Sequence, residues 1–163
     1  MPEPDVARGF RDVDSSGDPS AFVEYLDAAR DDLVDLKRRA VDGLALRAGD
    51  AMLDVGCGTG EELRSLAQIV GPQGRVVGID RSERLVAEAR ARTRENPIIE
   101  LVVADAHAVP FAEGEFSACR VERVLMHVED PGTALAQMAR VHACRRPRGR
   151  DRAGLGHADH RQR

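Results

Sequence analysis

Two spacings of apolar residues alternate along the chain. Four short apolar runs are typical of buried strands, and they cover about 51–55, 75–79, 98–103 and 116–121. Apolar residues at helical spacing lie between and after these runs, over about 59–70, 83–94 and 131–141. Strands that alternate with helices predict a parallel, doubly wound α/β sheet of the Rossmann-like kind. On the last helix, we expect one apolar face to hold Ala134, Leu135, Met138 and Val141.

Helix boundaries are marked by capping and breaking residues. Ser82 and Asp130-Pro131 are typical helix starts, whereas Gly71-Pro72 and Asn96-Pro97 end helices. Before the first strand, Asp18-Pro19-Ser20 begins a further helix.

Two N-terminal helices are expected, of which the second ends near Gly43. The first carries an apolar stripe of Phe22, Tyr25 and Leu26, which is interpreted either as core packing or as a lid over a ligand crevice. Residues 1–17 are polar and predict a flexible arm.

Charge changes sharply near the end of the chain. Residues 1–140 carry 26 acidic and 17 basic residues, and residues 141–163 carry 2 and 7, which together give the net charge of −4. We therefore expect one folded domain over 18–142 and a basic tail over 143–163 that lacks apolar periodicity and is disordered. An arginine-rich tail can be a nucleic-acid arm, but it has no interleaved aromatic residues and the body is acidic, so nucleic acid is not an expected partner.

The cysteines and the hydropathy of the chain indicate where in the cell the protein is expected. The three cysteines, Cys57, Cys119 and Cys144, form no CxxC pair, which predicts reduced thiols and no metal site. No apolar run reaches membrane-spanning length and the N-terminus is unlike a signal peptide, so we expect a cytoplasmic protein.

The glycine-rich stretch 54–60, Asp-Val-Gly-Cys-Gly-Thr-Gly, lies between the first strand and the next helix. Such a turn sits at the carboxyl end of a strand, where α/β sheets bind ligands. A Walker A loop is excluded because the required lysine is absent, and a dinucleotide fingerprint lacks its third glycine at Glu61. Glu61 and Glu62 would oppose a pyrophosphate at a helix start, so they favour a neutral or cationic ligand.

Four segments together resemble class I S-adenosylmethionine (SAM)-dependent methyltransferases. The matching segments are 53–60, 77–82, 103–111 and 121–128 followed by Asp130-Pro131. The nearest branch is methyltransferase type 11, which is related to the C-methyltransferases of ubiquinone and menaquinone biosynthesis. The resemblance covers about 45–141 and implies strand order 3-2-1-4-5-7-6, of which this chain supplies 3-2-1-4. The fold expected for this chain is thus part of a class I methyltransferase fold.

The resemblance implies a cofactor role for several residues. Asp80 would accept hydrogen bonds from the ribose hydroxyls, with helix capping or solvation as the alternative. Asp54 would help to hold the methionine ammonium group. Asp105 would accept a hydrogen bond from the adenine amino group, with a surface position as the alternative. The backbone would approach the cofactor closely at Gly56, Gly58 and Gly60, and the adenine ring would be flanked by Ala106 and His107.

Three more residues have two interpretations each. Arg81 either packs near the ribose or adenine or is solvated. Glu122 either touches cofactor or substrate or does not. His127 is a candidate general base, because its pKa suits neutral pH, or it packs or caps beneath the helix start at Asp130. Cys57 is expected to be a small turn residue and not a nucleophile.

The sequence departs from the family pattern after Val141. Members continue into a fifth strand, whereas this chain becomes rich in arginine, which suggests a truncated or frameshifted reading frame. Strand four would then be an open edge, with low stability and self-association as consequences. The expected function is methyl transfer from SAM to an unidentified small molecule. The alternatives are a non-catalytic SAM-binding remnant and a nicotinamide-dependent oxidoreductase.

Overall fold

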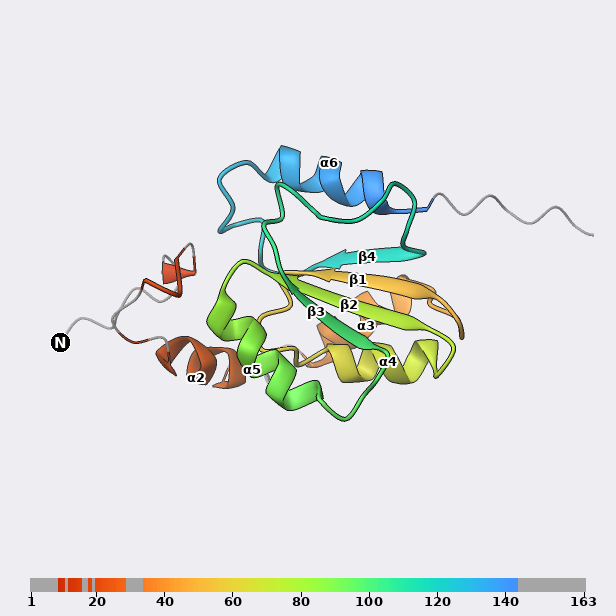
Figure 1. Ribbon diagram of the computed structural model, residues 1–163, viewed down its shortest axis with the longest axis horizontal. Coiled ribbons are helices and arrows are strands. Elements are labelled where there is room, and N and C mark those ends of the chain that lie inside the picture. Colours follow the sequence, from red (N-terminus) through yellow and green to blue (C-terminus); the bar gives the residue numbers. More distant parts are fainter. Residues whose placement is uncertain (1–8, 11, 16–17, 19, 29–33, 144–163) are drawn as a thin grey trace, which may run out of the picture.

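The parallel sheet expected from the sequence is present in the computed structural model (Figure 1). The structure describes residues 9–10, 12–15, 18, 20–28 and 34–143. All neighbouring strands are parallel in the order β3-β2-β1-β4, which confirms the expected part of the family topology. The strands are β1 (Ala51–Val55), β2 (Arg75–Asp80), β3 (Ile99–Val103) and β4 (Ala118–Val121). The helices are α2 (Ser20–Ala28), α3 (Val34–Gly43), α4 (Leu63–Val70), α5 (Glu83–Thr93) and α6 (Pro131–Val141).

The predicted caps explain where the helices begin and end. The Ser82 hydroxyl accepts the Leu85 N–H at 3.2 Å, and Asp130 accepts the Gly132 and Thr133 N–H groups at the start of α6. One predicted start is wrong, because α4 begins at Leu63 and not at Thr59. Gly60 lies between them and has a φ of 76°, which is incompatible with a helix.

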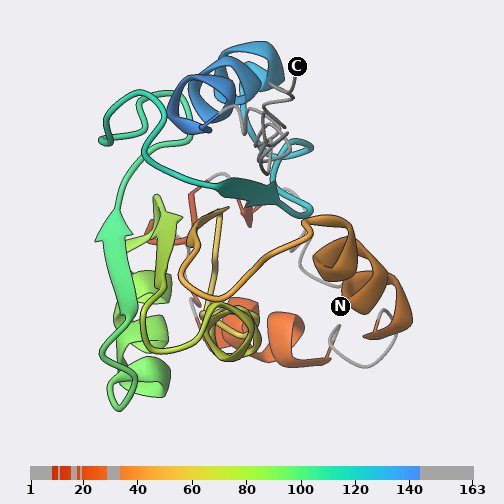
Figure 2. The same cartoon turned by 90° about the vertical axis from the view of Figure 1, so that its right-hand side faces the viewer.

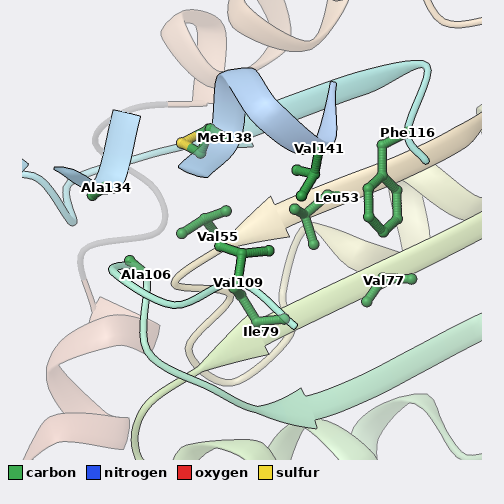
Figure 3. Close-up of a cluster of buried hydrophobic side chains, with 10 residues drawn as sticks. All are labelled: Leu53, Val55, Val77, Ile79, Ala106, Val109, Phe116, Ala134, Met138 and Val141. Atoms are coloured by element: carbon green, nitrogen blue, oxygen red, sulfur yellow. The ribbon is translucent and has the colours of Figure 1, made fainter. Parts of the chain in front are cut away.

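One face of the sheet packs against α6. Leu53, Val55 and Val77 contact the buried α6 residues, together with Phe116 from the loop before β4 (Figure 3). The buried α6 residues are Ala134, Met138 and Val141, as predicted. Leu135 was expected on the same face, but it is 47% exposed, because the helix turns it away from the sheet.

The opposite face is covered by α3 and α4. Met52, Val76 and Ala118 point to this side and pack against α4 and against Val41 of α3. Figures 1 and 2 show α6 on one side of the sheet and α4 and α5 on the other. The alternation of β1 side chains between two cores is what a doubly covered parallel sheet requires.

The N-terminal region forms a third small core. Val13, Phe22 and Leu85 are buried against each other, and Phe10 packs at their edge. Asp14 accepts hydrogen bonds from the Ser82 hydroxyl at 2.6 Å and from the Glu83 N–H at 2.8 Å. The described residues of the expected arm are therefore docked on the start of α5.

The outer edge of β4 is paired at its beginning. A parallel bridge joins Phe116 to His142, and the Ala143 N–H donates to the Phe116 oxygen at 2.7 Å. In the part of the chain that the structure describes, no strand continues this pairing along Ala118–Val121. Of the expected tail over 143–163, all residues after Ala143 lie outside the described part of the chain. Among the residues that are described, no helix has the length and apolarity needed to cross a membrane.

Candidate cofactor site

A cavity of about 250 Å³ opens at the carboxyl ends of the strands. Its walls come from the segments that follow β1, β2, β3 and β4 and from the N-terminal region. Six acidic side chains line it, namely Asp54, Glu61, Glu62, Asp80, Asp105 and Glu122. Four cationic side chains also line it, namely Lys37, Arg81, Arg120 and Arg123. The excess of acidic groups favours a ligand with net positive charge.

The glycine turn forms the floor of this cavity. Gly56, Gly58 and Gly60 have φ angles of 73°, 54° and 76°, which side chains rarely adopt. A Cβ atom on Gly56 would lie 2.1 Å from Cγ2 of Val124. The turn is fixed to β2, because the Gly56 N–H donates to the Ile79 oxygen at 2.7 Å. Glycine is therefore required here by conformation and by space.

Asp80 ends β2 and reaches the glycine turn. Its carboxylate accepts the Gly58 N–H at 2.9 Å and the Ser82 N–H at 3.0 Å. Burial raises the pKa of Asp80, and these backbone donors oppose that rise. Each carboxylate oxygen has a second lone pair, so the side chain can accept further hydrogen bonds from a ligand. Asp80 thus makes the predicted contact at the start of α5, with Ser82, and also lines the cavity.

Asp54 forms a buried ion pair that the sequence reasoning missed. Asp54 and Arg120 are register partners on β1 and β4, and Nη1 of Arg120 lies 3.1 and 3.3 Å from the two Asp54 oxygens. Nη2 of Arg120 also contacts Glu122. Burial raises the pKa of Asp54 to about 6, although Arg120 acts in the opposite direction. An arginine within the apolar run 116–121 was the signal that could have found this group.

Asp105 follows β3 and is exposed. Its Oδ1 accepts the His107 N–H at 2.8 Å and lies 2.7 Å from Nδ1 of the same histidine. These contacts lower the pKa of Asp105, the backbone N–H most, and Arg81 contributes. Ala106 is buried beside them, whereas Arg81 is exposed at the cavity wall. The residues expected around an adenine ring are therefore close together.

The two glutamates after the glycine turn have cationic partners. Glu62 forms an ion pair with Lys37 of α3 at 3.0 Å, and Glu61 lies 3.9 Å from Arg92 of α5. Glu62 is the N-cap residue of α4, which starts at Leu63. These cationic partners make the expected repulsion of an anion weaker than the sequence alone indicates.

His127 lines the cavity and packs against Phe10, with ring centroids 5.3 Å apart. A second histidine, His107, lies under the start of α6, where its Nε2 accepts the Asp130 N–H at 3.2 Å. Arg123, also at the cavity wall, has a φ of 56°, a strained conformation that is common at functional sites.

Neither described cysteine has the properties of a nucleophile. Burial, with Asp54 and Asp80 nearby, raises the pKa of Cys57 well above its usual value. Burial also raises the pKa of Cys119 to about 11. A thiol with a raised pKa is protonated at neutral pH, which agrees with the expected role of Cys57 as a turn residue.

A Rossmann-like sheet with an acidic cavity beside a glycine turn at the strand ends is typical of proteins that bind a small cofactor. The model of the family described as "Methyltransferase domain" (type 11) matches residues 53–145. The chain therefore belongs to this family of class I SAM-dependent methyltransferases.

The chain is similar to several individual proteins, of which two carry methyltransferase names. The chain is 44% identical over 130 residues to an uncharacterized 37.1 kDa protein in transposon TN4556 of Streptomyces fradiae, a match that covers 78% of this chain and 37% of that protein. It is 45% identical over 105 residues to 2-phytyl-1,4-naphtoquinone methyltransferase of Thermosynechococcus vestitus, covering 64% and 47%. It is 35% identical over 105 residues to demethylmenaquinone methyltransferase of Staphylococcus aureus, covering 64% and 44%. The chain thus spans about half or less of the length of these relatives.

Solved structures share the fold. A SAM dependent methyltransferase from Aquifex aeolicus superposes with a TM-score of 0.68 at 23% identity, covering 78% of this chain and 69% of that one. The [4+2]-cyclase SpnF superposes with a TM-score of 0.58 at 28% identity, covering 64% and 40%. Because a fold hosts several activities, the reaction must be argued from the site.

Proposed function

We propose that the chain binds SAM in this cavity and transfers its methyl group to a small molecule. The observation that carries the proposal is the Asp80 carboxylate, which closes the glycine turn and keeps acceptor capacity toward the cavity. A carboxylate at this place suits the two hydroxyls of a ribose. The family match supports the same ligand.

The residues present fit the two ends of such a cofactor. Asp80, Asp105 and Ala106 would hold the nucleoside. Asp54, Glu122 and the glycine turn would hold the amino-acid head group. When bound, the cofactor supplies an electrophilic methyl group on a sulfonium centre. The protein contributes acidic groups that favour a cationic ligand, together with alignment and partial exclusion of water.

The acceptor is proposed from the lining and from the relatives. Phe10, Tyr25 and Met126 line the same cavity, and an aromatic and apolar wall suits a planar, apolar acceptor. Two relatives carry names of naphthoquinone and menaquinone methyltransferases. We therefore propose a reduced quinone ring as the acceptor class. His127 would be within the cavity to receive a proton from it.

Calorimetric titration of SAM, beside NAD⁺, tests the proposal. We expect micromolar SAM binding and at least a roughly tenfold loss in Asp80→Asn, since a hydrogen bond to a charged group is worth about 1.5–3 kcal/mol. Asp42→Asn makes the same change away from the cavity lining and should bind normally. Circular dichroism checks that each variant is folded.

Transfer is measured separately, with methyl-labelled SAM and naphthoquinols. Unchanged SAM affinity in Asp80→Asn would refute the ribose assignment. NAD⁺ binding in place of SAM would support the oxidoreductase. SAM binding without methyl transfer to any quinol would refute the proposed acceptor class, but the assignment of the cofactor site would still hold.

A further inference from the structure

Arg120 is a buried cation in the cavity wall, and its Nε forms no hydrogen bond with the described residues. It is 8% exposed and lies on β4 beside Asp54 of β1. A guanidinium carries five N–H donors, of which Nη1 serves Asp54 and Nη2 serves Glu122. Its Nε is buried without a hydrogen-bond partner among the residues that the structure describes. An unsatisfied buried donor costs free energy, so an acceptor supplied by a ligand is favoured there.

The other cations of the cavity are placed differently. Lys37 is paired with Glu62 at 3.0 Å. Arg81 lies toward Asp105, whose pKa it helps to lower, and so belongs to the nucleoside end. Arg123 is exposed, with Glu122 at 3.6 Å. Arg120 is thus the buried cation beside the glycine turn and the strand ends.

Glu122 is able to exchange partners. It follows the last residue of β4, and its side chain is 26% exposed, compared with 8% for Arg120. Asp54, in contrast, is held within β1 and is buried, so its pairing with Arg120 is fixed. The cluster of Asp54, Arg120 and Glu122 carries one positive and two negative charges.

We propose that Arg120 binds the carboxylate of an amino-acid head group through Nε and Nη2, and that Glu122 moves from Nη2 to the ammonium group of the same ligand. The proposal rests on the function proposed above and names the group that reads the methionine end of SAM. After the exchange every charge of the cluster and of the amino-acid head group has a partner: the ligand carboxylate and Asp54 on Arg120, and the ligand ammonium on Glu122. Guanidinium groups suit this role because they bind carboxylates in a bidentate manner.

Ligands that differ only in the carboxylate test this exchange. Calorimetry compares SAM with decarboxylated SAM and with 5′-methylthioadenosine, for the wild type, Arg120→Met, Arg120→Lys and Arg47→Met. We expect the wild type to prefer SAM over decarboxylated SAM by about tenfold to a hundredfold, the value of a charge-assisted hydrogen bond. Arg120→Met should abolish this preference, Arg120→Lys should keep part of it, and Arg47→Met, which changes an exposed arginine outside the cavity lining, should leave it intact.

Each result decides between roles. Equal wild-type affinity for SAM and decarboxylated SAM overturns the proposal, and this comparison needs no variant to fold. Loss of all three ligands in a folded Arg120→Met would show a structural role only and also overturns it. A wild type that binds 5′-methylthioadenosine as tightly as SAM overturns the role of Arg120 and leaves only the nucleoside part of the site. A wild type that binds none of the three refutes the proposed function itself.

Discussion

The close packing of Val124 on Gly56 gives a sharp prediction about the glycine turn. Alanine at position 56 would place a Cβ 2.1 Å from Cγ2 of Val124 and 3.1 Å from Cγ1, at a φ of 73°. Gly49 provides a matched control, since its φ is 84° but no atom lies within 4 Å of the added Cβ. The two substitutions therefore share the strained conformation and differ in the steric clash.

The magnitudes follow from these two contributions. A positive φ costs an alanine about 1–2 kcal/mol, which is the whole expected loss in Gly49→Ala. Overpacking adds about 1–3 kcal/mol, so Gly56→Ala should lower the free energy of unfolding by about 2–5 kcal/mol. Val124→Ala removes both clashing methyl groups, so the double variant should be more stable than the sum of the single effects by about 1–3 kcal/mol.

Urea unfolding followed by circular dichroism measures these differences. Equal losses in Gly56→Ala and Gly49→Ala would refute the steric part of the reasoning. Strict additivity of Gly56→Ala and Val124→Ala would do the same, because it would show that the two residues do not press on each other.

Two further predictions concern acidity and the sheet edge. The folded pKa of Asp54 is about 6, above its usual value near 4, so this group stabilises the fold fully below about pH 4 and loses that contribution as the pH rises through about 6. SAM binding should have the opposite trend and weaken about tenfold from pH 7 to pH 5. The reason is that the cationic ligand needs the ionised carboxylate of Asp54, which lies in the cluster with Arg120, Glu62, Asp80 and Glu122. Calorimetry that shows a constant SAM affinity over this range contradicts the prediction. We also propose that the outer edge of β4 mediates self-association, which analytical ultracentrifugation should detect as a mass that grows with concentration. The Ser117 N–H donates inward to Ala51, so the alternating Ala118 N–H faces outward, and Ala118→Pro should reduce association; a wild type that stays monomeric would count against this edge.

Local patterns were sufficient for most of the fold. The apolar runs located all four strands, and the caps at Ser82 and Asp130 placed the starts of α5 and α6. The strand order followed from the family resemblance, because periodicity alone does not say which strands pair. The start of α4 was predicted too early because spacing does not reveal that Gly60 takes a positive φ, which a helix cannot contain.

The sequence predicted many residues of the cavity lining, but it did not predict the partners of the acidic ones. The aspartates at strand ends are visible as sequence motifs, whereas their partners come from distant segments. Arg120 pairs with Asp54 across 66 positions, and Asp14 reaches Ser82 across 68. No local pattern announces such contacts, since they depend on strand register and on how the N-terminal residues dock.

A crystal structure of the chain grown with S-adenosylhomocysteine tests the central assignment most directly. We expect the ribose hydroxyls within hydrogen-bond distance of Asp80, the adenine beside Asp105 and Ala106, and the amino-acid carboxylate on Arg120. A ligand bound elsewhere, or one whose ribose does not reach Asp80, would contradict the assignment of this cavity as the cofactor site.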